Sequence, residues 1–407
     1  MQQEGKRHLE TWRIGALALL AFATMLPVTL PVPVLRELIQ DRFAVSELLT
    51  SLFMSINMVG AAFAAPLAGV LADRFGRRPA LIAGALGADA LCFVALSRAE
   101  SFEAFMAIRL VEGAAHILAL SLLLSLASGA RGPKQRGRVL GVVGGAMMLG
   151  VGVGAPIGGA AGRDDPLAPL GLAAVLAGVA ALLAAAVLRE HGAAGGARPG
   201  WREIAALVRQ RRILLAPLLF AFVDRFTVGF YTTTLTLFLR RVHDLPADRI
   251  GLLMAVFLLP FALFSWPFGW LAERTSRTAL LCGGSLLYGV GTASLTFWPP
   301  AALPLVMAGI GVTAAVMFVP SMLLTTQIAS ERVRSTALGS FNAAGSLGFI
   351  VGPITGGLVT QWVAGATGDW AIGYRTAFAV AGATEIAIAL LAFPLLWRWE
   401  RCRFSRG

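Results

Sequence analysis

GVLADRFGRRPALI, residues 69–82, is a short polar turn between two long apolar segments. Glycine at its start allows close helix contact, the aspartate ends a helix, a second glycine forms the turn, and arginines make the turn basic. These residues are Gly69, Asp73, Arg74, Gly76, Arg77 and Arg78. A short basic turn between two apolar helices is typical of a membrane protein with many spans.

A variant of this turn recurs later in the chain as GWLAERTSRTALL, residues 269–281. Gly269, Glu273 and Arg274 each lie 200 positions after their counterparts. A second pair of related segments, VLGVVGGAMMLGVGVGAPIGG at 139–159 and ALGSFNAAGSLGFIVGPITGG at 337–357, is offset by 198 positions. The two halves of the chain are therefore predicted to be parallel repeats of one structural unit.

Composition supports a membrane protein, because 57% of the residues are hydrophobic and only 14% are charged. Such a chain has too little polar surface to cover a soluble globule. A helix that crosses the hydrocarbon needs about 20 apolar residues. Twelve segments satisfy this requirement: 13–35, 46–71, 79–97, 102–128, 138–161, 167–189, 213–238, 249–272, 278–298, 302–328, 336–362 and 375–397.

The distribution of Lys and Arg predicts the orientation. With the N-terminus inside, the cytoplasmic segments hold 24 basic residues and the external loops hold 8. Both termini are therefore expected to be cytoplasmic. The net charge of +12 is explained by basic loops beside anionic lipid headgroups, so no nucleic-acid partner is expected. The first apolar segment lacks a cleavage pattern and is expected to remain as the first helix.

The sequence predicts three parts: an N-terminal six-helix bundle at 1–189, a cytoplasmic linker at 190–212 and a C-terminal six-helix bundle at 213–407. Within the linker, Trp201, Ile204, Ala205 and Val208 fall on one helical face between arginines. That pattern is typical of a short helix on the membrane surface, and a flexible linker is the alternative.

The turn at 69–78 and its repeat resemble the signature loop between the second and third helices of the major facilitator superfamily. The resemblance implies an all-α membrane fold of twelve helices in two six-helix bundles, which transports by alternating access. It assigns gating to the turn, with Asp73 favouring the N-terminal end of the eleventh helix, near Arg334.

The second pair of segments resembles the Gly-Pro-x-x-Gly-Gly element of antiporter and drug-efflux branches of that superfamily. The eleventh helix matches fully, whereas the fifth carries Ala155 at the proline position and Pro156 one residue late. Small residues and prolines there allow close packing and bending. They are Gly150, Gly154, Pro156, Gly158, Gly352, Pro353, Gly356 and Gly357, and ordinary glycine-rich packing remains the alternative to an export signature.

RLVEGAAH, residues 109–116 in the fourth helix, resembles the Arg-x-x-x-Gly motif of the family in Arg109 and Gly113. At about 100° per residue, Glu112 and His116 project within roughly 60° of Arg109. Ionisable groups at this depth cost several kcal/mol unless they face a partner or a cavity, which makes them candidate functional residues. A purely structural ion pair of Arg109 and Glu112 is the alternative.

The seventh helix supplies a second candidate group in DRFTVGFYTTTLT, residues 224–236. Asp224 shares a helical face with Thr227 and Tyr231, whereas Arg225 projects about 100° away. The resemblance places the first, fourth, seventh and tenth helices around the central cavity, so that one of these two charges faces it. Either charge can instead pair with a neighbouring helix.

Two further acids, Asp89 and Glu385, lie in the third and twelfth helices, which the family places at the bundle periphery. The expected proton carriers are Glu112 and Asp224, each of which has an arginine close in sequence on a helix that the resemblance places at the cavity. Asp89 and Glu385 are the secondary candidates. The chain has only four histidines, none near another in sequence, and no metal-ligand spacing, so neither an enzyme nor a metal or other cofactor is expected.

The sequence therefore predicts a proton-coupled exporter of hydrophobic or amphipathic small molecules in the inner (plasma) membrane. Its expected partners are a small-molecule substrate, the proton gradient and membrane lipids, and the chain is expected to be a monomer. A lipid or lysolipid flippase, an importer of a polar metabolite and a non-transporting receptor remain alternatives.

Overall fold

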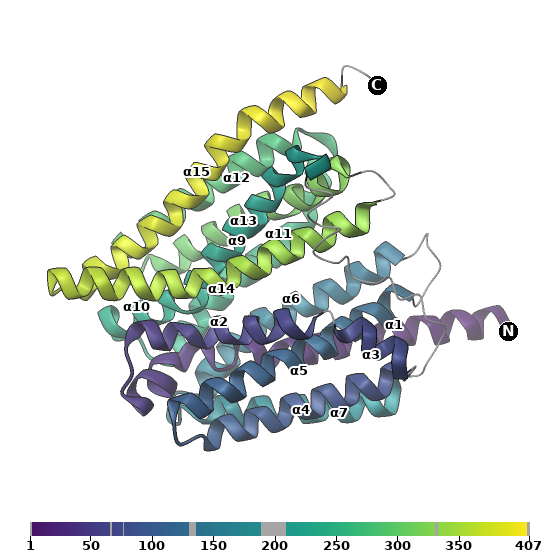
Figure 1. The fold of residues 1–407 in the computed structure, drawn as a ribbon, viewed down its shortest axis with the longest axis horizontal. Coiled ribbons are helices and arrows are strands. Elements are labelled where there is room, and N and C mark those ends of the chain that lie inside the picture. Colours follow the sequence, from purple (N-terminus) through teal and green to yellow (C-terminus); the bar gives the residue numbers. More distant parts are fainter. Residues whose placement is uncertain are drawn as a thin grey trace. The chain divides into compact units, whose positions relative to one another are not determined.

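A computed structural model describes residues 2–65, 67–75, 77–129, 136–188, 209–329 and 333–404, and helices make up nearly all of this part of the chain (Figure 1). The helices are α1 (Gln2–Thr29), α2 (Glu47–Ala64), α3 (Leu67–Phe75), α4 (Arg78–Arg98), α5 (Phe102–Gly129), α6 (Arg136–Ala161), α7 (Ala168–Val187), α9 (Leu215–Thr232), α10 (Thr234–His243), α11 (Ala247–Arg274), α12 (Arg277–Ser294), α13 (Leu303–Ile328), α14 (Arg334–Thr367) and α15 (Trp370–Phe404).

Twelve spans in the described residues are long and apolar enough to cross a membrane, which confirms the predicted all-α fold class. Most of the predicted limits lie within a few residues of the observed ones. The last two spans are longer than predicted, at Thr336–Thr367 and Trp370–Cys402, because α14 and α15 extend past their apolar cores. The seventh span also extends further than predicted, to His243, whereas the second ends earlier, at Ala64. The linker region 190–208, with its possible surface helix, lies outside the described residues.

Irregular backbone occurs in the first and seventh spans, among others of the described residues. Beyond α1 the chain continues as a short 3-10 helix at Val32–Val34 and a π-helix at Arg36–Asp41. The seventh span breaks at Thr233, which separates α9 from α10. The hydroxyls of Thr232 and Thr233 both donate to the carbonyl of Gly229, at 3.0 and 2.9 Å, and so satisfy a backbone oxygen beside the break.

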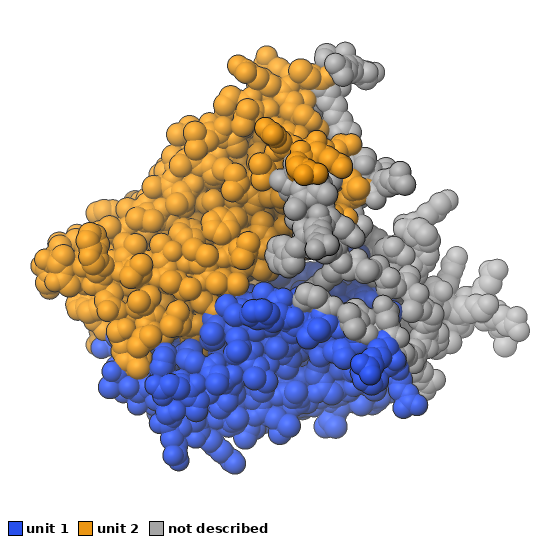
Figure 2. All heavy atoms as spheres, in the orientation of Figure 1, with its two compact units in different colours: residues 1–44, 56–197, 246–252 blue, residues 45–55, 198–245, 253–407 orange. Residues whose placement is uncertain are grey.

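The chain forms two compact units, coloured in Figure 2. Each unit includes a short segment from the other half of the sequence: Val45–Ser55, at the start of α2, groups with unit 2, and Pro246–Leu252, at the start of α11, groups with unit 1. Unit 1 comprises Met1–Ala44, Ile56–Ala197 and Pro246–Leu252, and unit 2 comprises Val45–Ser55, Arg198–Leu245 and Leu253–Gly407.

The same pairs of helices pack in both units. In unit 1, α1 lies along α6 and α4 lies along α7; in unit 2, α9 lies along α14 and α12 lies along α15. These are the first, fifth, third and sixth spans of each half, so the packing follows the repeat visible in the sequence. Unit 1 has an aliphatic core in which Leu20, Leu86 and Leu122 are almost fully buried, whereas Tyr231, Phe257 and Phe378 contribute to an aromatic core in unit 2.

Candidate functional site

Unit 1 holds a buried group of charged side chains on α4 and α5. These two helices are antiparallel neighbours, which brings the middle of α4 beside the first half of α5. Arg109 and Glu112, one helical turn apart, form an ion pair with Nη1 and Oε2 2.6 Å apart. Each side chain is 1% exposed, so this pair is shielded from solvent.

A third helix contributes to the same ion pair. The side-chain amide of Asn57 on α2 donates to Oε2 of Glu112, the oxygen that also accepts from Arg109. Both donors therefore converge on one carboxylate oxygen. Of the two acids on α4 and α5, Glu112 is therefore the one that has a positively charged partner at hydrogen-bond distance.

Glycine at two positions makes this contact between α2 and α5 geometrically allowed. A Cβ atom on Gly113 would overlap the backbone of Asn57, and a Cβ atom on Gly60 would overlap the backbone carbonyl of Leu110. The glycine of the Arg-x-x-x-Gly motif thus serves the close crossing that brings Asn57 to Glu112. The sequence did not reveal Asn57, because its role depends on the crossing of two helices.

The position of His116 on α5 suggests contact with Arg109 or Glu112, but its hydrogen-bonding partner is on α4. Its Nδ1 lies 3.5 Å from Oδ2 of Asp89 on α4, and Asp89 is fully buried. One ligand atom from each of Asp89, Glu112 and His116 lies within 4.8 Å of the others, a spacing short enough for one cation. Because the three come from two helices, linear spacing in the sequence cannot show this group. The guanidinium of Arg109 beside Glu112 opposes a divalent cation there.

Unit 2 contains a second acid–arginine pair, in which the acid is buried and the arginine is half-buried. Asp224 and Arg225 project in different directions from α9, yet the long arginine side chain reaches back so that Nη1 and Oδ2 are 2.6 Å apart. The guanidinium also lies over the ring of Phe318, 4.7 Å from its centroid. The two charges therefore neutralise each other, and neither needs a charged partner on a neighbouring helix.

The other candidates of unit 2 lie near this pair in sequence or on the twelfth span. Tyr231 is buried, stacks on Phe257 with centroids 4.9 Å apart, and its hydroxyl lies 2.8 Å from that of Thr292. Glu385 on α15 is fully buried and accepts a 2.6 Å hydrogen bond from Ser285 on α12. Its other carboxylate oxygen has no hydrogen-bond partner among the described residues.

A polar cluster that the sequence analysis missed lies in unit 2. Glu47, at the start of α2, is buried, accepts a hydrogen bond from the hydroxyl of Tyr374, and lies 3.5 Å from Arg241. The guanidinium of Arg241 covers the ring of Trp370 at 3.7 Å from its centroid. The four residues come from three segments that are distant in the sequence, so their spacing does not reveal the cluster. The one signal in the sequence is an acid, Glu47, at the start of a predicted span.

The residues of the repeated turn are described only in part. The structure does not describe Gly76, the burial of Gly69 or the side chain of Asp73. The structure does describe four other residues of the two turns, and all four are exposed: Arg74, Arg77, Glu273 and Arg274. The guanidinium of Arg274 lies over the ring of Trp270, 3.8 Å from its centroid.

The glycines of the second motif lie where two helices meet. In unit 1, a Cβ atom on Gly150 or Gly154 of α6 would meet the backbone of α1, and one on Gly158 would meet the backbone of Leu30, just after α1. In unit 2, a Cβ atom on Gly352 of α14 would meet the backbone of Phe226 on α9, and one on Gly356 would meet Thr234. Pro353 packs against Gly229. The displaced Pro156 lies inside α6, which continues to Ala161.

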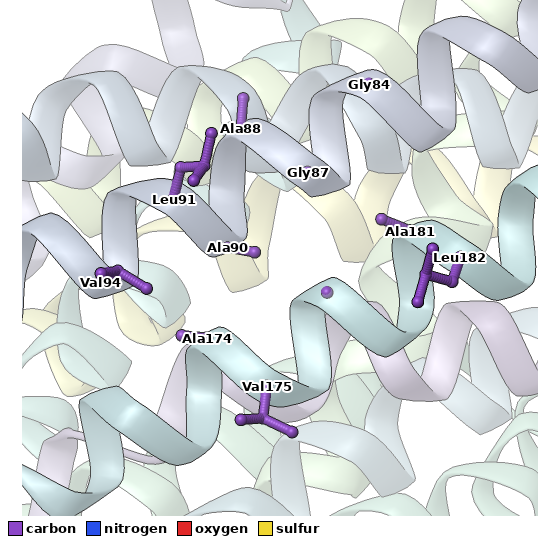
Figure 3. A pocket seen from close by; sticks show the side chains of 11 residues that line it. Gly84, Gly87, Ala88, Ala90, Leu91, Val94, Ala174, Val175, Ala181 and Leu182 are labelled. Atoms are coloured by element: carbon purple, nitrogen blue, oxygen red, sulfur yellow. The ribbon is translucent and has the colours of Figure 1, made fainter.

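An apolar groove of about 750 Å³ lies between α4 and α7, and it contains none of these polar side chains (Figure 3). Small and aliphatic residues line it, among them Gly87, Leu91, Val175 and Leu182. Leu91 and Leu182 are 71% and 72% exposed, so the groove opens on the surface, as expected of a face that meets lipid. It therefore adds nothing to the polar site.

Comparison with known proteins gives concordant results. The family model described as Major Facilitator Superfamily matches residues 17–247 and 217–402. The chain is 28% identical over 335 residues to the uncharacterized MFS-type transporter YceJ of Bacillus subtilis, a match that covers 80% of this chain and 84% of that protein. It is 27% identical to the class G tetracycline resistance protein of Vibrio anguillarum, covering 75% of this chain and 79% of that protein.

A solved structure shares the fold. The crystal structure of a bacterial homolog to the human lysosomal transporter Spinster, in an inward-facing and unoccupied conformation, superposes with a TM-score of 0.83 at 17% identity, covering 96% of this chain and 97% of that one. These matches confirm the resemblance seen in the repeated turn and exclude an enzyme. The chain belongs to the major facilitator superfamily of membrane transporters.

Proposed function

We propose that the chain is a secondary active transporter that exports hydrophobic or amphipathic small molecules in exchange for protons. The observation that carries this proposal is the presence in each unit of an acid–arginine pair whose acid is buried, both within membrane spans. Such groups are costly in a bilayer and mark substrate or proton pathways. The sequence also contains no nucleotide-binding loop, so an ion gradient is the remaining energy source.

The pairs suggest how a proton can drive the cycle. While the acid of a pair is ionised, its negative charge balances the positive charge of the arginine. A proton bound within the cluster raises its net charge by one unit, which changes the relative stability of the transporter's two conformations. Alternating access of the two halves then exchanges an inward proton for an outward substrate.

Gating and orientation complete the proposal. We assign Asp73, Arg74, Arg77, Glu273 and Arg274 to the cytoplasmic gate, with both termini cytoplasmic and the protein in the plasma membrane. The basic character of these turns supports the assignment.

Export is favoured over the alternatives by two observations. Gly352, Pro353, Gly356 and Gly357 fit the antiporter element, and a relative that matches most of the chain is named a tetracycline resistance protein. A flippase for lipids or lysolipids, an importer of a polar metabolite and a receptor without transport are the competing functions.

The test is transport by purified protein in liposomes that contain a pH-sensitive dye, with tetracycline, ethidium, a lysophospholipid, a sugar and an amino acid as probes. We expect tetracycline or ethidium to drive proton movement. Glu112→Gln and Asp224→Asn should lower gradient-driven accumulation at least about tenfold and preserve substrate exchange, since a missing charge costs more than about 1.4 kcal/mol. Glu103→Gln, at an exposed position on the same helix as Glu112, is the matched control.

Different outcomes separate the competing functions. If both variants still accumulate substrate at the wild-type proton stoichiometry, the two pairs do not carry coupling. Movement of lysophospholipid alone supports a flippase, proton-driven sugar or amino-acid uptake supports an importer, and binding without flux supports a receptor.

A further inference from the structure

The charged group of unit 1 contains one negative charge that no positive charge matches. Glu112 is paired with Arg109 at 2.6 Å and also accepts from Asn57. Among the described residues, the hydrogen-bonding partner of the fully buried Asp89 is the imidazole of His116, at 3.5 Å. With a neutral imidazole, the four ionisable groups Asp89, Arg109, Glu112 and His116 carry a net charge of −1.

No neighbouring helix supplies the missing charge near the middle of the membrane. The sequence of α7 has no ionisable residue, and α1 has none after Arg13. The charged residues of the other packed helices lie near the helix ends. One further titratable group, the thiol of Cys92, lies one turn from Asp89. All these groups are Glu47 on α2, Asp73 and Arg74 on α3, Arg78, Cys92 and Arg98 on α4, Glu103 on α5, and Arg136 and Arg138 on α6.

Two buried atoms of this group also have no hydrogen-bond partner among the described residues. They are Oδ1 of Asp89 and Nε2 of His116. Because the carboxylate can only accept, Nδ1 of a neutral His116 must carry the proton that faces Asp89. Nε2 is then a free lone pair beside a buried anion, which is a site for one more proton.

Charge balance distinguishes a proton from a metal ion. A buried carboxylate without a matching charge costs several kcal/mol, and one added proton brings the net charge of the group to zero. A divalent cation would instead leave a net charge of +1 beside Arg109. We infer that Asp89 and His116 together form the proton-binding pair of unit 1, with Glu112 as the fixed counter-ion of Arg109.

The chemistry is a simple acid–base step. A proton from water binds Nε2 of His116, which becomes an imidazolium held by Asp89, and the same proton later returns to water. The group changes from −1 to zero and back. This inference rests on the proposed function only for its use in transport, because proton binding by the pair does not require a substrate.

The experiment is nitrogen-15 NMR of purified protein with labelled histidine. The chain has four histidines, His8, His116, His191 and His243, and the His116 signal is identified by its loss in His116→Gln. At about pH 6, where an imidazole can be charged, we expect His116 to be an imidazolium in wild type and in Asp89→Glu. Asp89→Asn should lower the ratio of charged to neutral imidazole at least about tenfold.

A double variant provides the matched control. Arg109→Gln/Glu112→Gln removes both members of a neutral ion pair, a change that buried pairs often tolerate. It should leave the ratio of charged to neutral His116 within about twofold of wild type, since the net charge is unchanged. Glu112→Gln alone is unsuitable as a control, because it leaves Arg109 unmatched beside the imidazole.

Three results would overturn the inference: an unchanged ratio in Asp89→Asn, an equal fall in the double variant, or a neutral wild-type His116 that carries its proton on Nε2. The last result needs no variant, so the inference stays testable if Asp89→Asn does not fold. Added Co²⁺ that gives visible absorption bands lost in His116→Gln would show a metal site instead. If the NMR results hold but liposomes show no proton-driven flux, the proposed function fails and the proton-binding pair stands.

Discussion

At the scale of single residues, burial decides which ion pairs matter. Glu47 is 1% exposed as a side chain and pairs with Arg241, whose side chain is 20% exposed. Arg240 and Asp244, close by in sequence, form a 3.0 Å pair in which Asp244 is 92% exposed. Exposed pairs contribute little because water screens both charges, whereas a buried charge that loses its partner is costly.

We therefore predict that Glu47→Gln destabilises the protein by about 2–4 kcal/mol, because it removes a buried charge and leaves the half-buried guanidinium of Arg241 unmatched. Thermal or denaturant unfolding in detergent measures this loss. Asp244→Asn is the control and should change stability by less than about 1 kcal/mol. Equal effects of the two changes would show that burial does not set the strength of these pairs.

At the scale of helices, glycine positions set how closely the spans approach. The crossing of α2 and α5 depends on Gly60 and Gly113, and it delivers Asn57 to Glu112. Other glycines have open space around them: a Cβ atom on Gly87 of α4 would meet nothing within 4 Å. Glycine content alone thus does not show which positions are required.

For this crossing we predict that Gly113→Ala destabilises the protein by about 1–3 kcal/mol, since the added methyl group forces α5 away from α2. Gly87→Ala should be neutral or slightly stabilising, because alanine favours the helix. Melting temperatures of the two variants in the same detergent test this. A Gly113→Ala protein as stable as Gly87→Ala would contradict the described crossing.

At the scale of the whole molecule, the twelve spans and the basic residues between them predict the topology. The turn after α11 should be cytoplasmic and the turn after α10 external, because their separation by one span puts them on opposite sides. Thr275 and Asp244 are exposed residues in these turns and therefore suit chemical labelling. Ala247, in the same external region as Asp244, is 8% exposed and packs against Gly159, so it is a poor labelling site.

Accordingly, Thr275→Cys and Asp244→Cys in a background without Cys92, Cys282 and Cys402 should react with an impermeant maleimide from opposite sides. In intact cells only the Asp244→Cys protein should be labelled, and after permeabilisation both should be. Labelling of both from the outside would refute the twelve-span topology.

The sequence by itself determined the fold class, the twelve spans and the family, because these follow from apolar length, from small residues at turns and from a motif repeated 200 positions apart. It also predicted that Arg109, Glu112 and His116 share one face of a helix, which is a local property of 3.6 residues per turn. The pairing of Arg109 with Glu112 followed from that local geometry.

Only the tertiary structure decided the partners that come from different helices. It paired His116 with Asp89, brought Asn57 to Glu112, and grouped Glu47 with Arg241 and Tyr374. These contacts depend on the rotation and closeness of packed helices, which glycine crossings and helix breaks such as Thr233 set. Linear spacing carries no record of that rotation, so an acid that seems isolated in the sequence can lie beside a histidine in the fold.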